Sequence, residues 1–222
     1  MSSDRRGFEP LEGDERLSSA ILSDSLDAAG QRDRVSRIRL APLAPGSRIL
    51  GRAWTVSFEP STDDNPSDPY GAAIDFISAI RVGEIAVIGT AESNESAFWG
   101  ELFSAAAMGA GAAGVVTDGN LRDTDKIVEM GFPAFSLSRR PIDYRGRMRV
   151  VGIGEPTSIG GVTIESGELI MADDDGLVAI PRFAENEVLQ RARERAGGES
   201  TVLSELRAGE TLRAVWERHG LL

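Results

Sequence analysis

The sequence contains no cysteine, and among its 222 residues there is a single histidine and a single lysine. Without cysteine there can be no disulfide bond, thiolate nucleophile or cysteine-ligated zinc. Because His219 is the only histidine, one chain cannot supply the several histidines of a histidine-ligated metal site. Lys126 lies beside acidic residues at a predicted helix start, so we interpret it as a surface charge rather than a Schiff-base nucleophile. Catalysis would depend on carboxylates, arginines, backbone amides and an oxygen-bound metal ion.

Long apolar runs are also missing. No stretch approaches the roughly 20 apolar residues that a membrane span needs, so we expect no membrane association. Met1 is followed by polar and charged residues rather than by the apolar run of a signal peptide, which favours a cytoplasmic location. The formal net charge of −11 disfavours binding to nucleic acid, which needs a basic surface. A small acid is the partner that we expect.

Strand and helix patterns alternate between residues 48 and 137, which predicts an α/β fold with a mostly parallel βαβ core sheet. The expected strands span 48–58, 84–90, 112–117 and 133–137, and the expected helices span 17–29, 70–82, 100–111 and 124–130. The polar segment 59–69 between them is predicted to be a loop.

The two ends of the chain differ from this core. Residues 1–13 are polar and predicted to be loose, and residues 14–222 are predicted to form a single domain. From residue 147 to 181 short β patterns with glycine-rich turns predict added antiparallel strands. C-terminal helices are expected at 184–196 and 200–218, with a break at Gly197-Gly198.

Two loops carry the residues that could perform chemistry. Ligands in α/β sheets bind outside the carboxyl ends of the strands, and the loops after strands 84–90 and 112–117 should meet there. The first loop leads into a helix start, where free backbone amides suit a carboxylate or phosphate. The second, TDGNLRD (117–123), is interpreted as a turn that presents Arg122 and Asp123. Glu101 adds an acid, and twenty residues separate it from Arg122.

The segment WGELFSAAAMGAGAAGVVTDGNLRDTDKIVEMGFPAF (99–135) resembles the RraA-like family. The resemblance extends through SDSLDAAG (23–30), GRAWTV (51–56), VGEIAVIG (82–89) and ADDDGLVAIP (172–181). That family includes divalent-metal 4-hydroxy-4-methyl-2-oxoglutarate aldolases, which also decarboxylate oxaloacetate, and regulators of ribonuclease E. The aldolases carry an acidic residue, a gap of twenty residues and then Arg-Asp, matched here by Glu101, Arg122 and Asp123.

The resemblance implies a role for each of these residues. Backbone amides of Gly100, Glu101, Leu102 and Phe103 would hold the carboxylate of a pyruvate moiety. Arg122 would bind the keto oxygen, and Asp123 would ligate Mg²⁺ or Mn²⁺. Glu101 stands where the aldolases often have aspartate and would act on water at the metal.

The family also supplies an acid from the C-terminal helix of a neighbouring subunit. Counted back from RAG (207–209), Glu199 is nearest that position, and Glu194 is the alternative. The resemblance thus implies a homotrimer or a hexamer with sites at subunit boundaries.

Three functions remain open at this point. One is a metal-dependent lyase that cleaves 4-hydroxy-2-oxo acids to pyruvate and decarboxylates oxaloacetate through the same pyruvate enolate. The alternative is a non-catalytic regulator that binds a ribonuclease or another protein. An enzyme that applies the same enolate chemistry to a carbohydrate acid is a third alternative.

Overall fold

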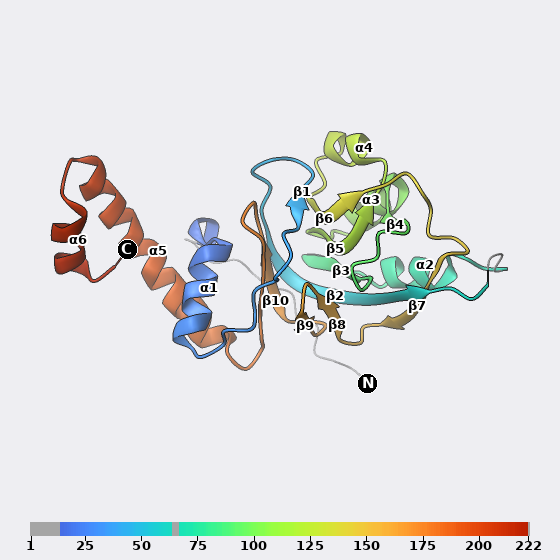
Figure 1. The fold of residues 1–222 in the computed structure, drawn as a ribbon, viewed down its shortest axis with the longest axis horizontal. Coiled ribbons are helices and arrows are strands. Elements are labelled where there is room, and N and C mark those ends of the chain that lie inside the picture. Colours follow the sequence, from blue (N-terminus) through green and yellow to red (C-terminus); the bar gives the residue numbers. More distant parts are fainter. Residues whose placement is uncertain (1–13, 64–66, 222) are drawn as a thin grey trace.

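The computed structural model describes residues 14–63 and 67–221. The predicted loose segment 1–13 and the middle of the predicted loop 59–69 lie outside the described residues. The rest is one mixed α/β domain with a curled sheet, from which a C-terminal helical arm projects (Figure 1).

Four parallel strands form the core of the sheet, as the sequence predicts. They are β2 (Ile49–Pro60), β3 (Glu84–Gly89), β5 (Gly114–Leu121) and β6 (Ala134–Arg139), adjacent in this order. Every residue of β3 and β5 is buried, as expected for parallel strands that are covered on both faces.

Antiparallel strands extend this core at several places. They are β1 (Ala41–Pro42) beside β6, β7 (Met148–Ile153) and β10 (Leu169–Ala172) beside β2, and β11 (Leu177–Ile180) beside β10. β8 (Thr157–Ile159) and β9 (Val162–Ile164) form a separate hairpin. The prediction of added antiparallel strands after residue 147 is therefore confirmed.

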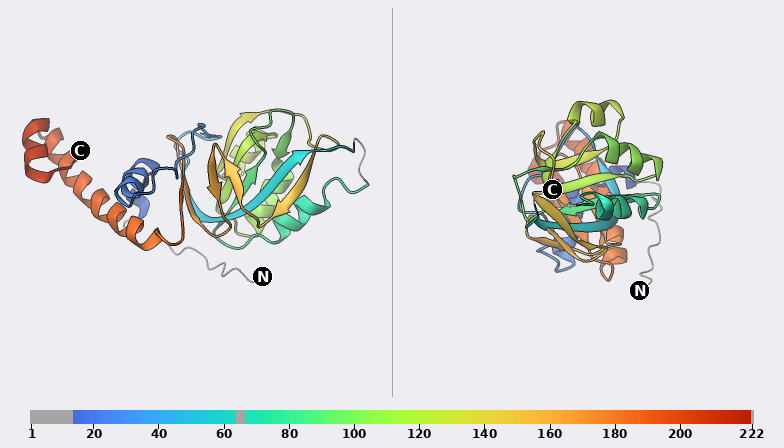
Figure 2. Two further views of the ribbon diagram at one scale, coloured as in Figure 1. Left: turned by 60° about the horizontal axis from the view of Figure 1, so that its bottom comes forward. Right: turned by 90° about the vertical axis from the view of Figure 1, so that its right-hand side faces the viewer.

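Each face of the core sheet has its own cover (Figure 2). The helices α2 (Gly71–Ser78), α3 (Glu101–Gly109) and α4 (Thr124–Glu129) cover one face, and the β8–β9 hairpin covers the other. Along β3, Ala86 and Ile88 belong to the helix-side core, whereas Ile85 and Val87 belong to the hairpin-side core. This alternation follows from the two-residue period of a strand.

A third apolar cluster joins the C-terminal arm to the sheet. α1 (Ser19–Ala28) and α5 (Glu185–Arg207) pack together over β10 and β11, next to the short helix η1 (Asp14–Arg16). α5 then runs away from the sheet. α6 (Leu212–His219) folds back and packs against α5 (Figure 1). In the described part of the chain, no helix is both long enough and apolar enough to cross a membrane.

The predicted helix break at Gly197-Gly198 is wrong, because α5 passes through both glycines without interruption. The helix ends instead at Arg207 with Ala208 as its C-cap, and Gly209 follows with a φ of 99°. Ala196 and Val202, on either side of the glycine pair, are buried. Packing on both sides offsets the low helix propensity of glycine, about 1 kcal/mol per residue relative to alanine.

The Gly197→Ala variant should therefore be more stable than the wild type. Nothing lies within 4 Å of a Cβ at position 197, so alanine should raise the free energy of unfolding by about 0.5–1 kcal/mol. Gly198→Ala is the matched comparison, because its Cβ would lie 2.9 Å from Leu221 Cδ2 and its gain should be smaller. Denaturant unfolding measures both, and a less stable Gly197→Ala protein would contradict a continuous α5.

Candidate functional site

The four parallel strands of the core end at one edge of the sheet, and the residues that follow them line a single cavity of about 470 Å³. Tyr70 follows β2, Phe98 to Gly100 follow β3, Arg122 and Asp123 follow β5, and Asp143 and Tyr144 follow β6. Ligands bind at this edge in α/β sheets generally, so the cavity is the candidate active site.

The interpretation of residues 117–123 as a turn is wrong, because β5 continues to Leu121. The short strand β4 (Ala97–Trp99) pairs with this extension, joining Ala97 to Asn120 and Trp99 to Leu121. The pairing of β5 with β6 shifts register between Thr117 and Asn120. The turn-forming residues Asp118-Gly119-Asn120 thus lie at an irregularity within a strand, where glycine is common.

Asp118 is a buried acid inside this extension, with 1% of its surface exposed. Its Oδ1 accepts hydrogen bonds from the backbone N and the Oγ1 of Thr90, at 2.7 and 2.9 Å, and its Oδ2 accepts one from Glu92 N at 3.0 Å. Burial raises the pKa of Asp118, and these hydrogen bonds oppose that rise. Ala91 and Glu92 have φ values of 53° and 57°, so Asp118 holds a strained backbone in place.

The start of α3 faces the cavity without a side-chain cap. Gly100 is the N-cap residue and has an extended backbone, and the amides of the first helical turn have no partner within the helix. Asp123 Oδ2 accepts a long hydrogen bond of 3.4 Å from Glu101 N. A carboxylate thus already approaches the position where the helix dipole favours an anion.

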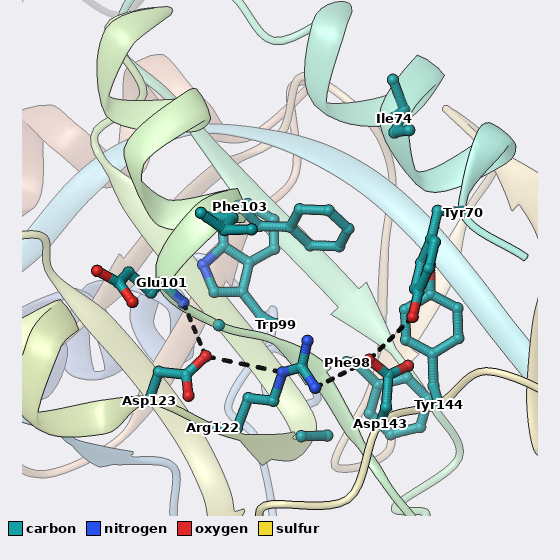
Figure 3. Close-up of a pocket in the computed structure, with 13 residues that line it drawn as sticks. Tyr70, Ile74, Phe98, Trp99, Glu101, Phe103, Arg122, Asp123, Asp143 and Tyr144 are labelled. Carbon is teal, nitrogen blue, oxygen red and sulfur yellow. Dashed lines mark hydrogen bonds and ion pairs between the residues drawn. The ribbon is translucent and has the colours of Figure 1, made fainter.

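Asp123 has a left-handed backbone, with φ 53° and ψ 38°. It occupies the N-cap position of α4, yet its side chain makes no capping hydrogen bond to that helix. The carboxylate is directed toward the start of α3 instead, and it lies 3.7 Å from Arg122 Nε (Figure 3). Uncommon backbone conformations of this kind are concentrated at functional sites.

Asp143 fixes the guanidinium of Arg122. Arg122 Nη1 lies 2.9 Å from Asp143 Oδ2, and the hydroxyl of Tyr70 donates to the same oxygen at 3.1 Å (Figure 3). The other oxygen, Oδ1, accepts a hydrogen bond of 2.8 Å from Arg145 N. Burial and then the Asp143 hydrogen bond raise the pKa of Tyr70, so its hydroxyl stays a proton donor near neutral pH. Arg122 is therefore held in one orientation at the cavity wall.

Not all of the predicted site residues lie together. Gly100, Glu101, Leu102, Phe103, Arg122 and Asp123 all line the cavity. The side chain of Glu101 points away from Arg122, however (Figure 3). Glu199 lies on α5 and pairs with Arg195 Nε at 2.8 Å, and Glu194 on the same helix accepts from Gln190 Nε2 at 3.0 Å. Neither of these two acids lines the cavity of its own chain.

Four residues of this region were not predicted from the sequence: Tyr70, Asp118, Asp143 and Tyr144. The rule that brought the loops after two strands to one edge applies equally to β2 and β6. Applied to all four strands, it would have identified Tyr70, Asp143 and Tyr144. Asp118 carried no such indication, because Asp-Gly-Asn is typical of an exposed turn.

The site could hold a divalent metal ion through only one or two protein ligands. Among the described residues, no three His, Cys, Asp or Glu side chains gather in a way that could hold a metal. Mg²⁺ commonly binds one or two carboxylates and completes its shell with water and substrate oxygens. Asp123 fits that pattern, because its side chain is 45% exposed and its contacts to Glu101 N and Arg122 Nε are long.

Comparison with known proteins gives the family. A model of the RraA-like family, described as Aldolase/RraA, matches residues 19–179. The chain belongs to the RraA-like family. The resemblance stated from residues 99–135 is thereby confirmed.

Among the similar proteins, one carries the name of an aldolase and another the name of a ribonuclease-inhibitor family. Protein DlpA of Legionella pneumophila is 28% identical over 87% of this chain, which spans only 31% of that relative's length. A Halalkalibacterium halodurans protein named "Putative 4-hydroxy-4-methyl-2-oxoglutarate aldolase" is 30% identical over 81% of this chain and 80% of its own. The solved structure of Streptomyces coelicolor RraAS2, titled an unusual member of the RNase ES inhibitor RraA protein family, has a TM-score of 0.75, with 26% identity over 87% of this chain and 98% of that chain.

Replacing Asp118 by alanine should destabilise the fold. The change leaves the N–H groups of the buried Thr90 and of Glu92 without their acceptor, which should cost about 2 kcal/mol or more. Asp75→Ala is the control, because Asp75 is an exposed acid within α2 and its loss should change stability by less than about 0.5 kcal/mol. Equal unfolding free energies for the two variants, measured in denaturant, would contradict the role of Asp118.

Proposed function

We propose that this protein is a divalent-metal-dependent, class II lyase that cleaves 4-hydroxy-2-oxo acids, such as 4-hydroxy-4-methyl-2-oxoglutarate, to pyruvate. Loss of carbon dioxide from oxaloacetate passes through the same pyruvate enolate, so decarboxylation is the expected second reaction. The observation that carries the proposal is the juxtaposition of Arg122 and Asp123 with the uncapped start of α3 in one cavity. The aldolase name of a relative that covers most of the chain also supports it.

Substrate binding would use the amides at the start of α3. The C1 carboxylate of the substrate would accept hydrogen bonds from backbone N–H groups within Gly100 to Phe103, where the helix dipole favours negative charge. The keto oxygen at C2 would then accept a hydrogen bond from Arg122, whose guanidinium also borders the cavity. Both contacts recognise the pyruvate end that all the proposed substrates share.

Bond cleavage would place negative charge on the C2 oxygen. When the C3–C4 bond breaks, its electrons would form a pyruvate enolate, and Arg122, which Asp143 holds at 2.9 Å, would donate to its C2 oxygen. Donors that are oriented before the reaction stabilise such charge without reorganisation. Mg²⁺ or Mn²⁺ held by Asp123 would supply further positive charge to the enolate.

Proton transfer is the step that would use a residue of a second chain. The C4 hydroxyl must lose a proton and C3 must gain one, yet the Glu101 carboxylate points away from Arg122 (Figure 3). We propose that Glu101, together with Glu199 of the partner subunit, orients the water that carries this proton. The projection of α5 away from its own sheet favours such an exchange within a homotrimer or hexamer (Figure 1).

A second candidate function is a non-catalytic regulator of a ribonuclease or another protein. The likeness to RraAS2 favours it, as do the exposed apolar side chains of Leu203, Leu212 and Trp216 on the projecting arm. A regulator does not need Arg122 and Asp123 in a cavity. The two functions are separated by assaying lyase activity and recovering a stoichiometric partner from the same preparation.

Removal of the metal should abolish pyruvate release from 4-hydroxy-4-methyl-2-oxoglutarate and from oxaloacetate. EDTA should stop the release and excess Mg²⁺ should restore it, whereas Asp123→Ala should stay inactive at any Mg²⁺ concentration used. Asp125→Ala, an exposed acid two residues away, is the matched control and should keep its activity. Release by Asp123→Ala at the wild-type rate, above the rate with metal alone, would contradict the proposal.

A methyl group at Gly100 should disable the site without unfolding the protein. A Cβ there would lie 2.8 Å from Asp123 Oδ2 and 3.0 Å from Arg122 Cγ, so both side chains must move. A displacement of this size is expected to lower kcat/KM about 100-fold. Gly109→Ala in the same helix is the control, because nothing lies within 4 Å of its Cβ. If both variants retain wild-type kcat/KM, the close approach of Gly100 has no catalytic importance.

A further inference from the structure

The charged groups of the cavity lie along one side of it, from the start of α3 through Asp123 and Arg122 to Asp143 (Figure 3). The rest of the wall is apolar and aromatic. It consists of Tyr70, Ile74, Phe98, Trp99, Phe103 and Tyr144. A substrate anchored by its pyruvate end would therefore direct its remaining atoms along aromatic rings.

These rings pack in two groups along the wall. Trp99 and Phe103 pack edge to face with ring centroids 5.7 Å apart, and Tyr70 packs edge to face on Tyr144 at 5.6 Å. Phe98 stacks on Tyr144 at 6.3 Å. Such a wall stabilises apolar or aromatic ligand groups and offers few donors to a charged group.

The charges at the cavity also disfavour a second carboxylate. Among the described lining residues Arg122 is the one cation, and Asp143 already pairs with it. The carboxylate of Asp143 would repel a substrate carboxylate placed farther along the wall. Arg139 and Arg140 line an adjacent cavity, which shares Arg122 and Asp123 with this one but contains none of the aromatic residues, so they add no cation to the aromatic wall.

We propose that the natural substrate is a 4-hydroxy-2-oxo acid whose group beyond C4 is uncharged and apolar, either aromatic or branched aliphatic. The inference rests on the proposed lyase function. In the reaction the C3–C4 bond breaks, the C4 hydroxyl loses its proton, and the electron pair passes into the pyruvate enolate. One proton then adds to C3, which gives pyruvate and an aldehyde or ketone that carries the apolar group.

The test compares two substrates that share the pyruvate end. For the full-length protein with Mg²⁺, kcat/KM for 4-hydroxy-2-oxo-4-phenylbutanoate should exceed that for 4-hydroxy-4-methyl-2-oxoglutarate by roughly tenfold or more. Deuterium incorporation into the methyl group of pyruvate in D₂O, followed by NMR, reports enolate formation without any group beyond C3.

A pair of arginine variants tests the apolar wall directly. Ile74 on α2 lines the cavity with 52% of its surface exposed, and Met108 on α3 is 50% exposed but does not line it. Ile74→Arg should shift the ratio of kcat/KM values toward the dicarboxylate by about tenfold, because it adds a cation to the wall. Met108→Arg changes the charge equally and should leave the ratio unaltered.

The outcomes separate the inference from the function on which it rests. Pyruvate exchange together with a preference for the phenyl substrate supports both. Exchange together with equal or better use of the dicarboxylate, or with cleavage of neither compound, overturns the apolar substrate class and leaves the enolate site standing. Absence of exchange from folded protein with Mg²⁺ overturns the lyase function and the inference together.

Discussion

The pairing of β4 with the extended end of β5 is the constraint on which the candidate site depends. It brings Trp99 beside Leu121, and Arg122 N donates to Trp99 O at 2.9 Å. This backbone contact sets Arg122 and Asp123 directly against the start of α3. The buried carboxylate of Asp118 stabilises the same region, because it accepts hydrogen bonds from the backbone N–H groups of Thr90 and Glu92 just after β3. The site thus lies on two paired strands and a helix terminus, which position side chains more accurately than free loops do.

Electrostatics at this edge are arranged around one arginine. Arg122 contacts Asp143 on one side and Asp123 on the other, at 2.9 and 3.7 Å. The shorter contact orients the guanidinium, and the longer one leaves Asp123 available for a cation. An anionic ligand at the start of α3 would add to two carboxylates already present, and the proposed divalent cation would offset that negative charge. The same two carboxylates would repel a second acidic group on the proposed substrate, and the aromatic rings beside them would not bind it.

Much of the fold follows from patterns that the sequence displays openly. The apolar runs around Ile85 to Ile88 and Gly114 to Val116 predict buried parallel strands, and the structure contains them. Arg122, Asp123 and the helix start could be placed at one edge because parallel strands end together. Local preference misled in two places. Asp118 to Asn120 lie in a strand, because β5 continues beyond them and pairs with β4 and β6 at Asn120 and Leu121. Gly197-Gly198 lie in a helix, because flanking residues are packed. Asp143 follows β6, so the same rule would have placed it near Arg122, but the ion pair of 2.9 Å between them is seen only in the folded chain.

Oxalate binding tests the central claim most directly, because oxalate mimics the planar pyruvate enolate with its two oxygens. Calorimetric titration in the presence of Mg²⁺ would compare the wild type with Arg122→Ala. The account predicts that oxalate binds the wild type and that affinity falls roughly tenfold or more in the variant, as expected for loss of a hydrogen bond to a charged group. Equal affinity for both proteins, or no binding to folded wild type, would contradict an enolate site built on Arg122.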